Sequence, residues 1–258
     1  AVLIALLLEK DHIAAAIQRA EILEASERLR RSILDSVSHE LKTPLAAVET
    51  GLAALEQQSK NDLAQTETVG EIKLATRRLN RVISNLVEMT RIEAGVVQPQ
   101  LDWCDIEEVV DGAVALAADA LSRHRLEVDI KQNLPMIKID HLLIEQSLAN
   151  LLANAANWSE SGKTITVSAD ISDNEMQLIV ADRGPGIPQE ELPHVFERFY
   201  RGAKAPSGGT GLGLSIVEGF IRAHGGSVHG ANRPGGGAEF RIQVPVEILN
   251  EKNLELDD

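Results

Sequence analysis

The chain has 258 residues, of which 44% are hydrophobic and 3% aromatic, and its formal net charge is −14. This composition excludes wholesale disorder. The acidic balance argues against nucleic acid as the main partner, because phosphate contacts need clustered Lys and Arg. The single cysteine, Cys104, excludes a disulfide framework and a four-thiolate zinc site. The longest apolar run, residues 1–8, is far shorter than the roughly 20 residues of a membrane-spanning helix, and it lacks the positive start of a signal peptide. Because the chain begins with Ala, we expect it to be a piece of a longer protein.

Two long helices are expected in the first hundred residues, where apolar residues recur at coiled-coil spacing. A polar stretch, 57–68, separates the two, and Gly95 is a candidate C-cap for the second. The seam residues are Leu34, Leu41, Val48 and Leu55 in the first helix, and Val69, Ile72, Thr76, Leu79, Ile83, Leu86 and Thr90 in the second. Because one hairpin cannot cover two seams, we expect it to dimerise into a four-helix bundle. A monomeric helical spacer is the alternative.

The pattern of apolar residues changes after Leu101, where segments of helical periodicity alternate with short segments of strand periodicity. Helices are expected over 106–121, 140–158 and 214–224, and strands over 126–130, 164–169, 176–182, 227–231 and 238–244. Helices mixed with hairpin-like strands predict an α+β sandwich of helices on a sheet. The acidic residues after Val246 are expected to fray.

His39 is the first candidate for chemistry, since it lies mid-helix between the seam positions Val37 and Leu41. Pro44 crowds the carbonyl of Glu40, so the helix should bend beside the histidine. A neutral imidazole is nucleophilic at physiological pH. Thr43 shares the face of His39 one turn later, whereas Glu40 needs a suitable rotamer or the bend to reach the ring.

Four further segments, in order along the second half, have the residue types of a nucleotide site. Asn150, Asn154 and Asn157 form one polar stripe on an otherwise apolar helix, and their amides can ligate Mg²⁺ or reach phosphate. The segment 182–188 places Asp182 at a strand end, where a carboxylate can accept the adenine amino group. Aromatic residues and two arginines gather in 196–201, and the glycine-rich run 208–215 precedes a helix whose first N–H groups can bind an anion. Taken singly, these segments also read as a solvated face, a turn, a core plug and a loop. The spacing is neither a Walker nor a Rossmann pattern, and the glycines and prolines of 183–213 indicate a flexible lid.

Taken together, these segments resemble the core of a bacterial sensor histidine kinase. The five ordered motifs are the phospho-acceptor box 39–44, the asparagine box 150–157, the first glycine box 182–187, the phenylalanine box 196–200 and the second glycine box 209–213. The segments 145–156, 208–220 and 232–240 are in addition similar to the Kdp potassium sensor kinases. The resemblance implies a helical hairpin dimerising into a four-helix bundle, followed by an α+β two-layer sandwich of the histidine kinase ATPase (GHKL) type.

The resemblance also implies roles for the motif residues. His39 would take the γ-phosphoryl group of ATP and pass it to an aspartate of a response regulator, Glu40 would orient the ring and accept its proton, and Thr43 would position water in a phosphatase reaction. Asn150 and Asn154 would hold Mg²⁺. The implied ATP-binding residues are Asn150, Asn154, Asn157, Asp182, Gly184, Gly186, Ile187, Arg198, Phe199, Arg201, Lys204, Gly209, Thr210, Gly211, Leu212 and Gly213.

Two departures from the family pattern and two rival functions remain at this point. Asn157 stands where the family commonly has a phosphate-binding Lys, for which Arg198, Arg201 and Lys204 are candidate replacements, and Trp158 replaces a smaller aromatic residue. Gyrase- and chaperone-type ATPases use a glutamate as general base at the position of Asn150, so water activation is not supported here. A scaffold with a dead nucleotide site is the other alternative.

The expected organisation has four parts. Residues 1–25 form a linker helix resembling the last helix of a GAF sensor domain, 26–98 the dimerisation and phosphotransfer domain, 99–247 the ATP-binding domain, and 248–258 an acidic tail. The expected partners are a second copy and a Kdp-type receiver domain, with no direct contact to nucleic acid and no membrane segment. The resemblance places the chain in the cytoplasmic portion of an inner-membrane potassium sensor.

Overall fold

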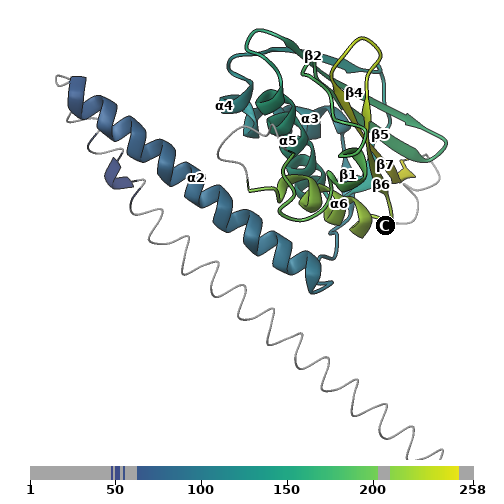
Figure 1. The fold of residues 1–258 in the computed structure, drawn as a ribbon. Coiled ribbons are helices and arrows are strands. Elements are labelled where there is room, and N and C mark those ends of the chain that lie inside the picture. Colours follow the sequence, from purple (N-terminus) through teal and green to yellow (C-terminus); the bar gives the residue numbers. More distant parts are fainter. Residues whose placement is uncertain (1–47, 49, 53–54, 56–62, 203–209, 250–258) are drawn as a thin grey trace, which may run out of the picture. The chain divides into compact units, whose positions relative to one another are not determined.

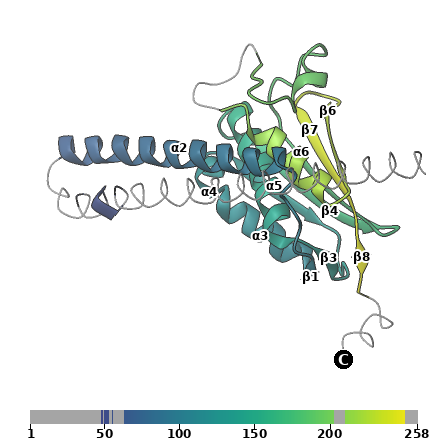
Figure 2. The same cartoon turned by 90° about the horizontal axis from the view of Figure 1, so that it is seen from below.

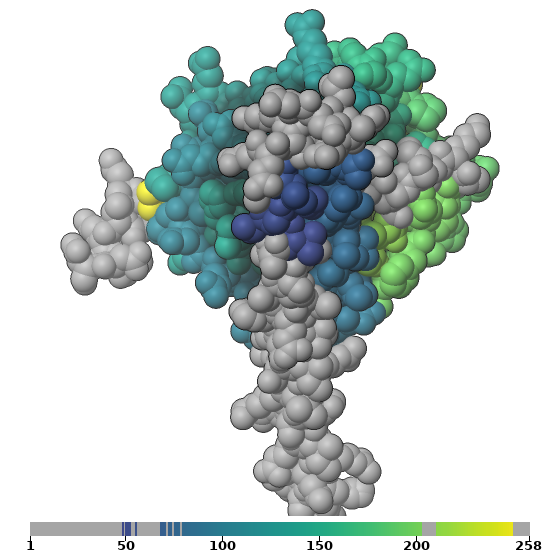
Figure 3. All heavy atoms as spheres, turned by 90° about the vertical axis from the view of Figure 1, so that its left-hand side faces the viewer, coloured from purple at the N-terminus to yellow at the C-terminus, as the bar shows by residue number. Residues whose placement is uncertain are grey.

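The computed structural model describes residues 48, 50–52, 55, 63–202 and 210–249, which are coloured in Figures 1 and 3, whereas all other residues are grey. The chain divides into two compact units, Ala1–Val96 and Val97–Asp258, and each is considered by itself. None of the described helices combines the length and the apolar character that a membrane crossing requires.

Helix α2, Leu63–Glu93, dominates the described part of the first unit (Figure 1). Gly95 ends it as predicted, in a left-handed conformation with φ +64°. The Gly95 N–H donates to Ile92 O at 3.0 Å and the Val96 N–H donates to Arg91 O at 3.1 Å. This pair of hydrogen bonds is the Schellman motif, which satisfies the last carbonyls of a helix.

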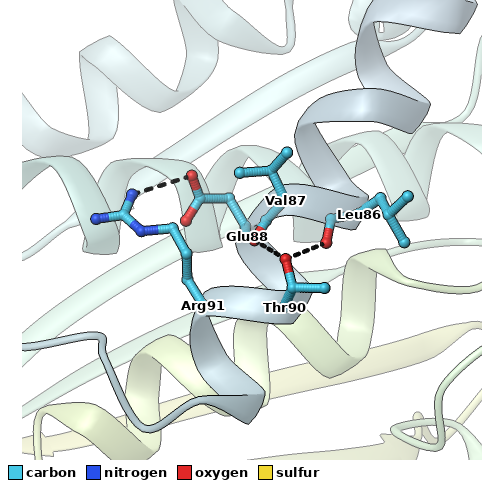
Figure 4. Close-up of polar contacts among 5 residues, drawn as sticks. All are labelled: Leu86, Val87, Glu88, Thr90 and Arg91. Carbon is cyan, nitrogen blue, oxygen red and sulfur yellow. Dashed lines mark hydrogen bonds and ion pairs between the residues drawn. The ribbon is translucent and has the colours of Figure 1, made fainter. Parts of the chain in front are cut away.

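One row of apolar seam residues on α2 is exposed. Ile72, Leu79 and Leu86 follow one another at seven-residue intervals and are 44%, 51% and 49% exposed. The polar seam residues are satisfied within the helix: Thr76 Oγ1 donates to Ile72 O at 2.9 Å, and Thr90 Oγ1 donates to the carbonyls of Val87 and Leu86 at 2.7 and 3.0 Å (Figure 4). Threonine therefore occupies this apolar seam without an unpaired hydroxyl.

The second unit is built on a five-stranded sheet in the order β2-β4-β5-β7-β6. The strands are β2 (Arg125–Ile130), β4 (Thr164–Ser172), β5 (Glu175–Ala181), β6 (Ser227–Asn232) and β7 (Ala238–Pro245). Burial alternates strictly along β4 and β7, so one face of the sheet is covered and the other is partly open. β2 pairs with β4 in parallel and the remaining neighbours are antiparallel. The parallel pair follows from the long connection between β2 and β4, which contains a strand and a helix.

Helices cover one face of this sheet, as Figure 2 shows. They are α3 (Ile106–Leu116), α4 (Ala118–Leu121), α5 (His141–Trp158) and α6 (Gly213–Ala223). Asp105 caps α3 by accepting from Glu107 N, and Asp140 caps α5 by accepting from Leu143 N. Apolar side chains of the helices and of β4, β5 and β7 form one continuous core. The α+β two-layer sandwich expected for this half of the chain is confirmed.

A second sheet of three short strands, in the order β1-β3-β8, was not predicted. Its strands are β1 (Asp102–Cys104), β3 (Ile137–Ile139) and β8 (Glu247–Ile248), paired antiparallel. Two or three residues are too few to show a period of two, which explains why the pattern missed them. The expectation that the chain frays directly after Val246 was wrong for the first residues, since β8 pairs there.

The helix expected over 106–121 is interrupted at Ala117, where φ is −91° and ψ is 1°. The Ala117 N–H still closes α3 on Ala113 O, while its carbonyl accepts from Leu121 N and starts α4. The break leaves Leu116 exposed and brings Ala117 and Leu121 into the core. No glycine or proline marks the break, so no local pattern predicts it.

Candidate functional site

Asp182 directly follows β5 and is held by the start of β7. Its Oδ1 accepts hydrogen bonds from Gly184 N at 2.8 Å and from Ala238 N at 3.0 Å, and its own N–H donates to Ala238 O at 2.9 Å. Among the described residues no hydrogen bond is found to Oδ2. The residue is only 3% exposed. One carboxylate oxygen is thus fixed by main-chain donors, and the other can accept from a ligand amino group.

The glycines around Asp182 are required by contacts within the protein. A Cβ at Gly184 would lie 2.5 Å from the carbonyl oxygen of Trp158, and one at Gly186 would lie 2.7 Å from Asn232 Oδ1. A Cβ at Gly237 would collide with the carbonyl oxygen of Asp182. Gly186 and Gly237 also have φ values of +77° and +94°, which disfavour any other residue. The loop therefore needs its glycines to pack against α5 and the β6–β7 turn.

The asparagine stripe lies on α5, whose C-terminal end meets the Asp182 loop. Arg183 N donates to Ser159 Oγ at 3.4 Å, directly after the helix. Asn150 and Asn154 are half-buried and Asn157 is exposed. A Cβ at Gly213 would lie 3.6 Å from Asn150 Oδ1, so the beginning of α6 is adjacent to the Asn150 amide. The structure brings the first, second and fourth of the predicted nucleotide segments together in one unit.

The N-terminus of α6 differs from those of α3 and α5, because in the described part of the chain no side chain caps it. Thr210 Oγ1 accepts from Leu212 N at 3.3 Å, one residue before the helix begins. Free N–H groups at a helix start, together with the helix dipole, form an anion site. This arrangement suits the phosphates of a nucleotide.

The phenylalanine segment approaches the glycine-rich loop through its main chain. Phe196 packs edge-on against Phe240, with ring centroids 6.1 Å apart. Phe199 has φ +60° and is 65% exposed, and its main chain lies so close to Gly211 that a Cβ there would be 2.6 Å from Phe199 C. Gly211 itself has φ +72°. The third and fourth segments are therefore in direct contact.

Tyr200 belongs to a cluster of ionisable groups near the short helix η1, Leu192–His194. His194 Nδ1 is 2.6 Å from Glu197 Oε1, and the His194 and Tyr200 rings are 5.9 Å apart. Partial burial, followed by the nearby carboxylates of Glu191 and Glu197, raises the pKa of the Tyr200 hydroxyl. The hydroxyl stays protonated at neutral pH and can donate to a carboxylate.

Several predicted site residues lie outside the described residues, and the structure gives no geometry for them. They are His39, Glu40, Thr43, Lys204 and Gly209. Arg198 and Arg201 are described and lie at the surface. Within the described ranges, no group of three or more His, Cys, Asp or Glu side chains could hold a metal ion. The Mg²⁺ expectation rests on the amide oxygens of Asn150 and Asn154.

Two residues that sequence reasoning gave no role, Asn232 and Arg233, contact the Asp182 loop. Arg233 Nη1 donates to Asp182 O at 3.0 Å. Asn232 Nδ2 donates to Ile187 O at 2.6 Å, and Asn232 Oδ1 accepts from Ile187 N at 2.7 Å. The available signals were the resemblance of segment 232–240 to the Kdp sensor kinases, which assigned no role to either residue, and the turn sequence Pro234–Gly237, which predicts that β6 and β7 form a hairpin.

Comparison with known families separates the two units. Residues 29–95 match the model of the His Kinase A (phospho-acceptor) domain. Residues 139–248 match the family described as histidine kinase-, DNA gyrase B-, and HSP90-like ATPase. The second family by itself includes several enzyme classes. The phospho-acceptor domain that precedes it in this chain distinguishes a histidine kinase from the gyrase- and HSP90-like members. The chain belongs to the sensor histidine kinases.

Curated relatives of this histidine kinase match most of its length. It is 31% identical to the sensor protein KdpD of Escherichia coli over 252 residues, which cover 96% of this chain and 28% of KdpD. The KdpD of Clostridium acetobutylicum is 31% identical over 250 residues, again 28% of that protein. The sensor-like histidine kinase SenX3 of Mycobacterium tuberculosis is 32% identical over 227 residues, 55% of its length. The histidine kinase chain thus spans less than a third of the KdpD relatives.

Solved structures agree with this assignment. Full-length ShkA in complex with AMPPNP superposes with a TM-score of 0.68 over 84% of this chain and 46% of ShkA, at 28% identity. The mycobacterial sensor histidine kinase MprB matches at 31% identity with a TM-score of 0.52, over 57% of this chain and all of the MprB chain.

Proposed function

We propose that this histidine kinase phosphorylates its own His39 from ATP and passes the phosphoryl group to an aspartate of a response-regulator receiver domain. The observation that carries the proposal is the convergence of three features in the second unit. Asp182 offers a fixed acceptor for an amino group, Asn150 lies beside Gly213, and α6 begins without a side-chain cap among the described residues. A purine with a polyphosphate tail matches this set of donors and acceptors.

The residues of the site also fit a divalent cation bound to phosphate. Asn150 and Asn154 supply amide oxygens, and Mg²⁺ typically takes few protein ligands and shares the rest with substrate phosphates and water. When bound, the ion would neutralise charge that develops on the transferring phosphoryl group. Asn150 and Asn154 would hold it.

Transfer to a side chain is favoured over hydrolysis of ATP. The position from which gyrase- and chaperone-type ATPases activate water is Asn150, and an amide cannot act as a general base. In the proposed reaction an imidazole nitrogen of His39 forms a bond to the γ-phosphorus while the bond to the bridging oxygen of ADP breaks. Glu40 accepts the imidazole proton. The regulator aspartate then attacks the phosphorus, the bond to the His39 nitrogen breaks, and His39 leaves as the free imidazole after taking the proton back from Glu40.

The first unit is proposed to dimerise through residues 26–98 and to present His39. The exposed row Ile72, Leu79 and Leu86 supports this, because a coiled-coil seam is stable only when a partner covers it. We further propose that residues 99–247 are the ATP-binding domain, that 1–25 link to an upstream sensor, and that 248–258 form a tail. The whole protein is then a membrane sensor with this part in the cytoplasm.

A Kdp-type receiver domain and a potassium response are our finer proposal. The 31% identity to two KdpD proteins supports it, together with the similar segments 145–156, 208–220 and 232–240. SenX3 is as similar in identity, so its regulator is the natural competitor. Faster transfer of label from the phosphorylated kinase to a Kdp-type receiver than to a SenX3-type receiver is the expected result. Equal or reversed rates contradict the Kdp assignment.

The central experiment is labelling with [γ-³²P]ATP and Mg²⁺. We expect an acid-labile, base-stable phosphoprotein in the wild type and none in His39→Gln, because a phosphoramidate hydrolyses in acid. Binding of a fluorescent ATP analogue should be unchanged in His39→Gln, since the nucleotide site lies in the second unit. Label that persists in His39→Gln refutes the acceptor. Free phosphate without phosphoprotein would indicate an ATPase, and neither product would indicate a scaffold.

A further inference from the structure

Asn232, the last residue of β6, connects two segments that are 45 positions apart in the sequence. Its side-chain amide makes a two-point contact with one residue: Oδ1 accepts from Ile187 N at 2.7 Å and Nδ2 donates to Ile187 O at 2.6 Å. The amide thus pairs with the main chain of Ile187 as a neighbouring strand would. Because both main-chain groups of Ile187 are used, the contact fixes the orientation of this residue as well as its position.

The contact between Asn232 and Ile187 requires a glycine at position 186. Gly186 precedes Ile187, and a Cβ there would lie 2.7 Å from Asn232 Oδ1. Any side chain at 186 would therefore displace the Asn232 amide. Gly186 also has φ +77°, which turns the chain so that Ile187 faces the end of β6.

The loop Asp182–Ile187 is held at both ends by residues of the β6–β7 hairpin. At its start, Ala238 N and Arg233 Nη1 bind Asp182 Oδ1 and O, respectively. At its end, Asn232 binds Ile187. Pro188 follows, and its carbonyl accepts from Glu191 N and Leu192 N in the turn that leads to η1. Ile187 is consequently the last residue of the loop that the sheet holds before the chain leaves toward the phenylalanine segment.

We propose that Asn232 is a positioning residue of the nucleotide site, which acts through Ile187 to hold the Asp182–Ile187 loop in the conformation that receives the base. The inference rests on the proposed binding of ATP at this loop. Asn232 is exposed and lies at the end of an edge strand, so its contribution to the core is small. Its hydrogen bonds therefore affect ligand binding more than folding.

The test compares Asn232→Ala with a matched control, Gln243→Ala. Gln243 belongs to the same β6–β7 ladder, and its Nε2 donates to Glu175 Oε1 at 2.8 Å on the exposed surface, at the far end from the loop. Both variants lose an exposed side-chain hydrogen bond of a strand residue. We expect Asn232→Ala to weaken a fluorescent ATP analogue by about fivefold and Gln243→Ala by less than about twofold. The melting temperatures of the two variants should agree within about 2 °C.

Two further readouts separate positioning from a general structural role. In autophosphorylation, the KM for ATP should rise about fivefold in Asn232→Ala with kcat at saturating ATP changed by less than about twofold. In an Asp182→Asn background, Asn232→Ala should cost less than about twofold, because both residues act on one bound base. The Ile187 amide should exchange with solvent deuterium faster in Asn232→Ala, since its acceptor is lost.

Unchanged affinity in Asn232→Ala overturns the proposal. So do equal losses in the wild-type and Asp182→Asn backgrounds, an equal loss in Gln243→Ala, or a melting temperature well below that of the control. Failure of the wild type to bind the analogue would instead contradict the proposed function. The two failures are thus distinguishable.

Discussion

Helices α2 and α5 use their apolar residues in opposite ways. α5 is covered within its own unit: Ile144, Leu148, Leu151 and Leu152 are all fully buried. α2 leaves Ile72, Leu79 and Leu86 about half exposed in one row. Hydrophobic burial stabilises a helix only where something covers it. The difference teaches that α5 is covered within one chain, whereas the α2 row presents an apolar surface suited to a second copy.

The largest effect is expected where that surface is made polar. Leu79→Glu combined with Leu86→Glu should raise the dimer dissociation constant by at least about three powers of ten, because burying unpaired carboxylates costs several kcal/mol each. Light scattering over a concentration series measures this. Arg81→Glu, on the opposite side of the helix, is the control and should stay dimeric. A wild type that is monomeric at micromolar concentration would contradict the proposal that a second copy covers the exposed row of α2.

A core substitution in α5 tests the other half of the comparison. Leu148→Ala should lower the free energy of unfolding of the second unit by about 2–5 kcal/mol, since the side chain is fully buried and leaves a cavity. Calorimetry at two protein concentrations should show the same loss at both. The effect of Leu79→Ala should instead grow on dilution, as expected for a dimer contact. A concentration-dependent loss in Leu148→Ala would contradict a self-contained second unit.

Asp182→Asn is expected to reduce ATP affinity without affecting the dimer. Loss of a charge-assisted hydrogen bond costs roughly 1.5–3 kcal/mol, or about 10- to 150-fold in affinity. Titration with a fluorescent ATP analogue gives the affinity, and light scattering verifies that α2 still pairs. Wild-type affinity in this variant would remove Asp182 from the site.

The smallest and most selective effect is expected at Thr43. If its hydroxyl orients water, Thr43→Ala should lose about tenfold in dephosphorylation of the partner regulator, while labelling of His39 changes by less than about twofold. The alternative is that the Thr43 hydroxyl only donates to the carbonyl of His39 in its own helix. Thr76 and Thr90 on α2 make hydrogen bonds of this kind. Thr50→Ala, one heptad later, is the matched control. Equal losses in both reactions would show that Thr43 only supports the helix.

The elements that could be predicted from the sequence are those long enough to show a period. α5, α6 and the strands of the larger sheet were found within a few residues, and Gly95 was recognised as a helix end. The start of α2 was predicted wrongly, because the helix already begins at Leu63, inside the polar stretch 57–68 that was expected to separate two helices. β1, β3 and β8 are too short, and the break at Ala117 depends on which side chains the core accepts. Tertiary packing decided these features, and no local pattern carries that information.

The candidate site divides in the same way. The residue types of Asp182, of the asparagines and of the glycine-rich loop indicate nucleotide binding. Their order along the chain strengthens that prediction. The contact between Asn232 and Ile187 has no such signal, because it joins two main-chain groups to one amide across 45 positions. Only the fold reveals that Gly186 makes room for Asn232.

The strand β8 has a practical consequence for anyone who shortens or tags this protein. Val246 N donates to Asn174 O at 2.8 Å, Leu249 N donates to Met136 O at 2.9 Å, and between them β8 covers the outer edge of β3. A chain cut at Pro245 would leave β3 with an open row of main-chain donors and acceptors, which invites pairing with other molecules. Fusion partners are therefore best joined after Leu249, where β3 is already paired with β8.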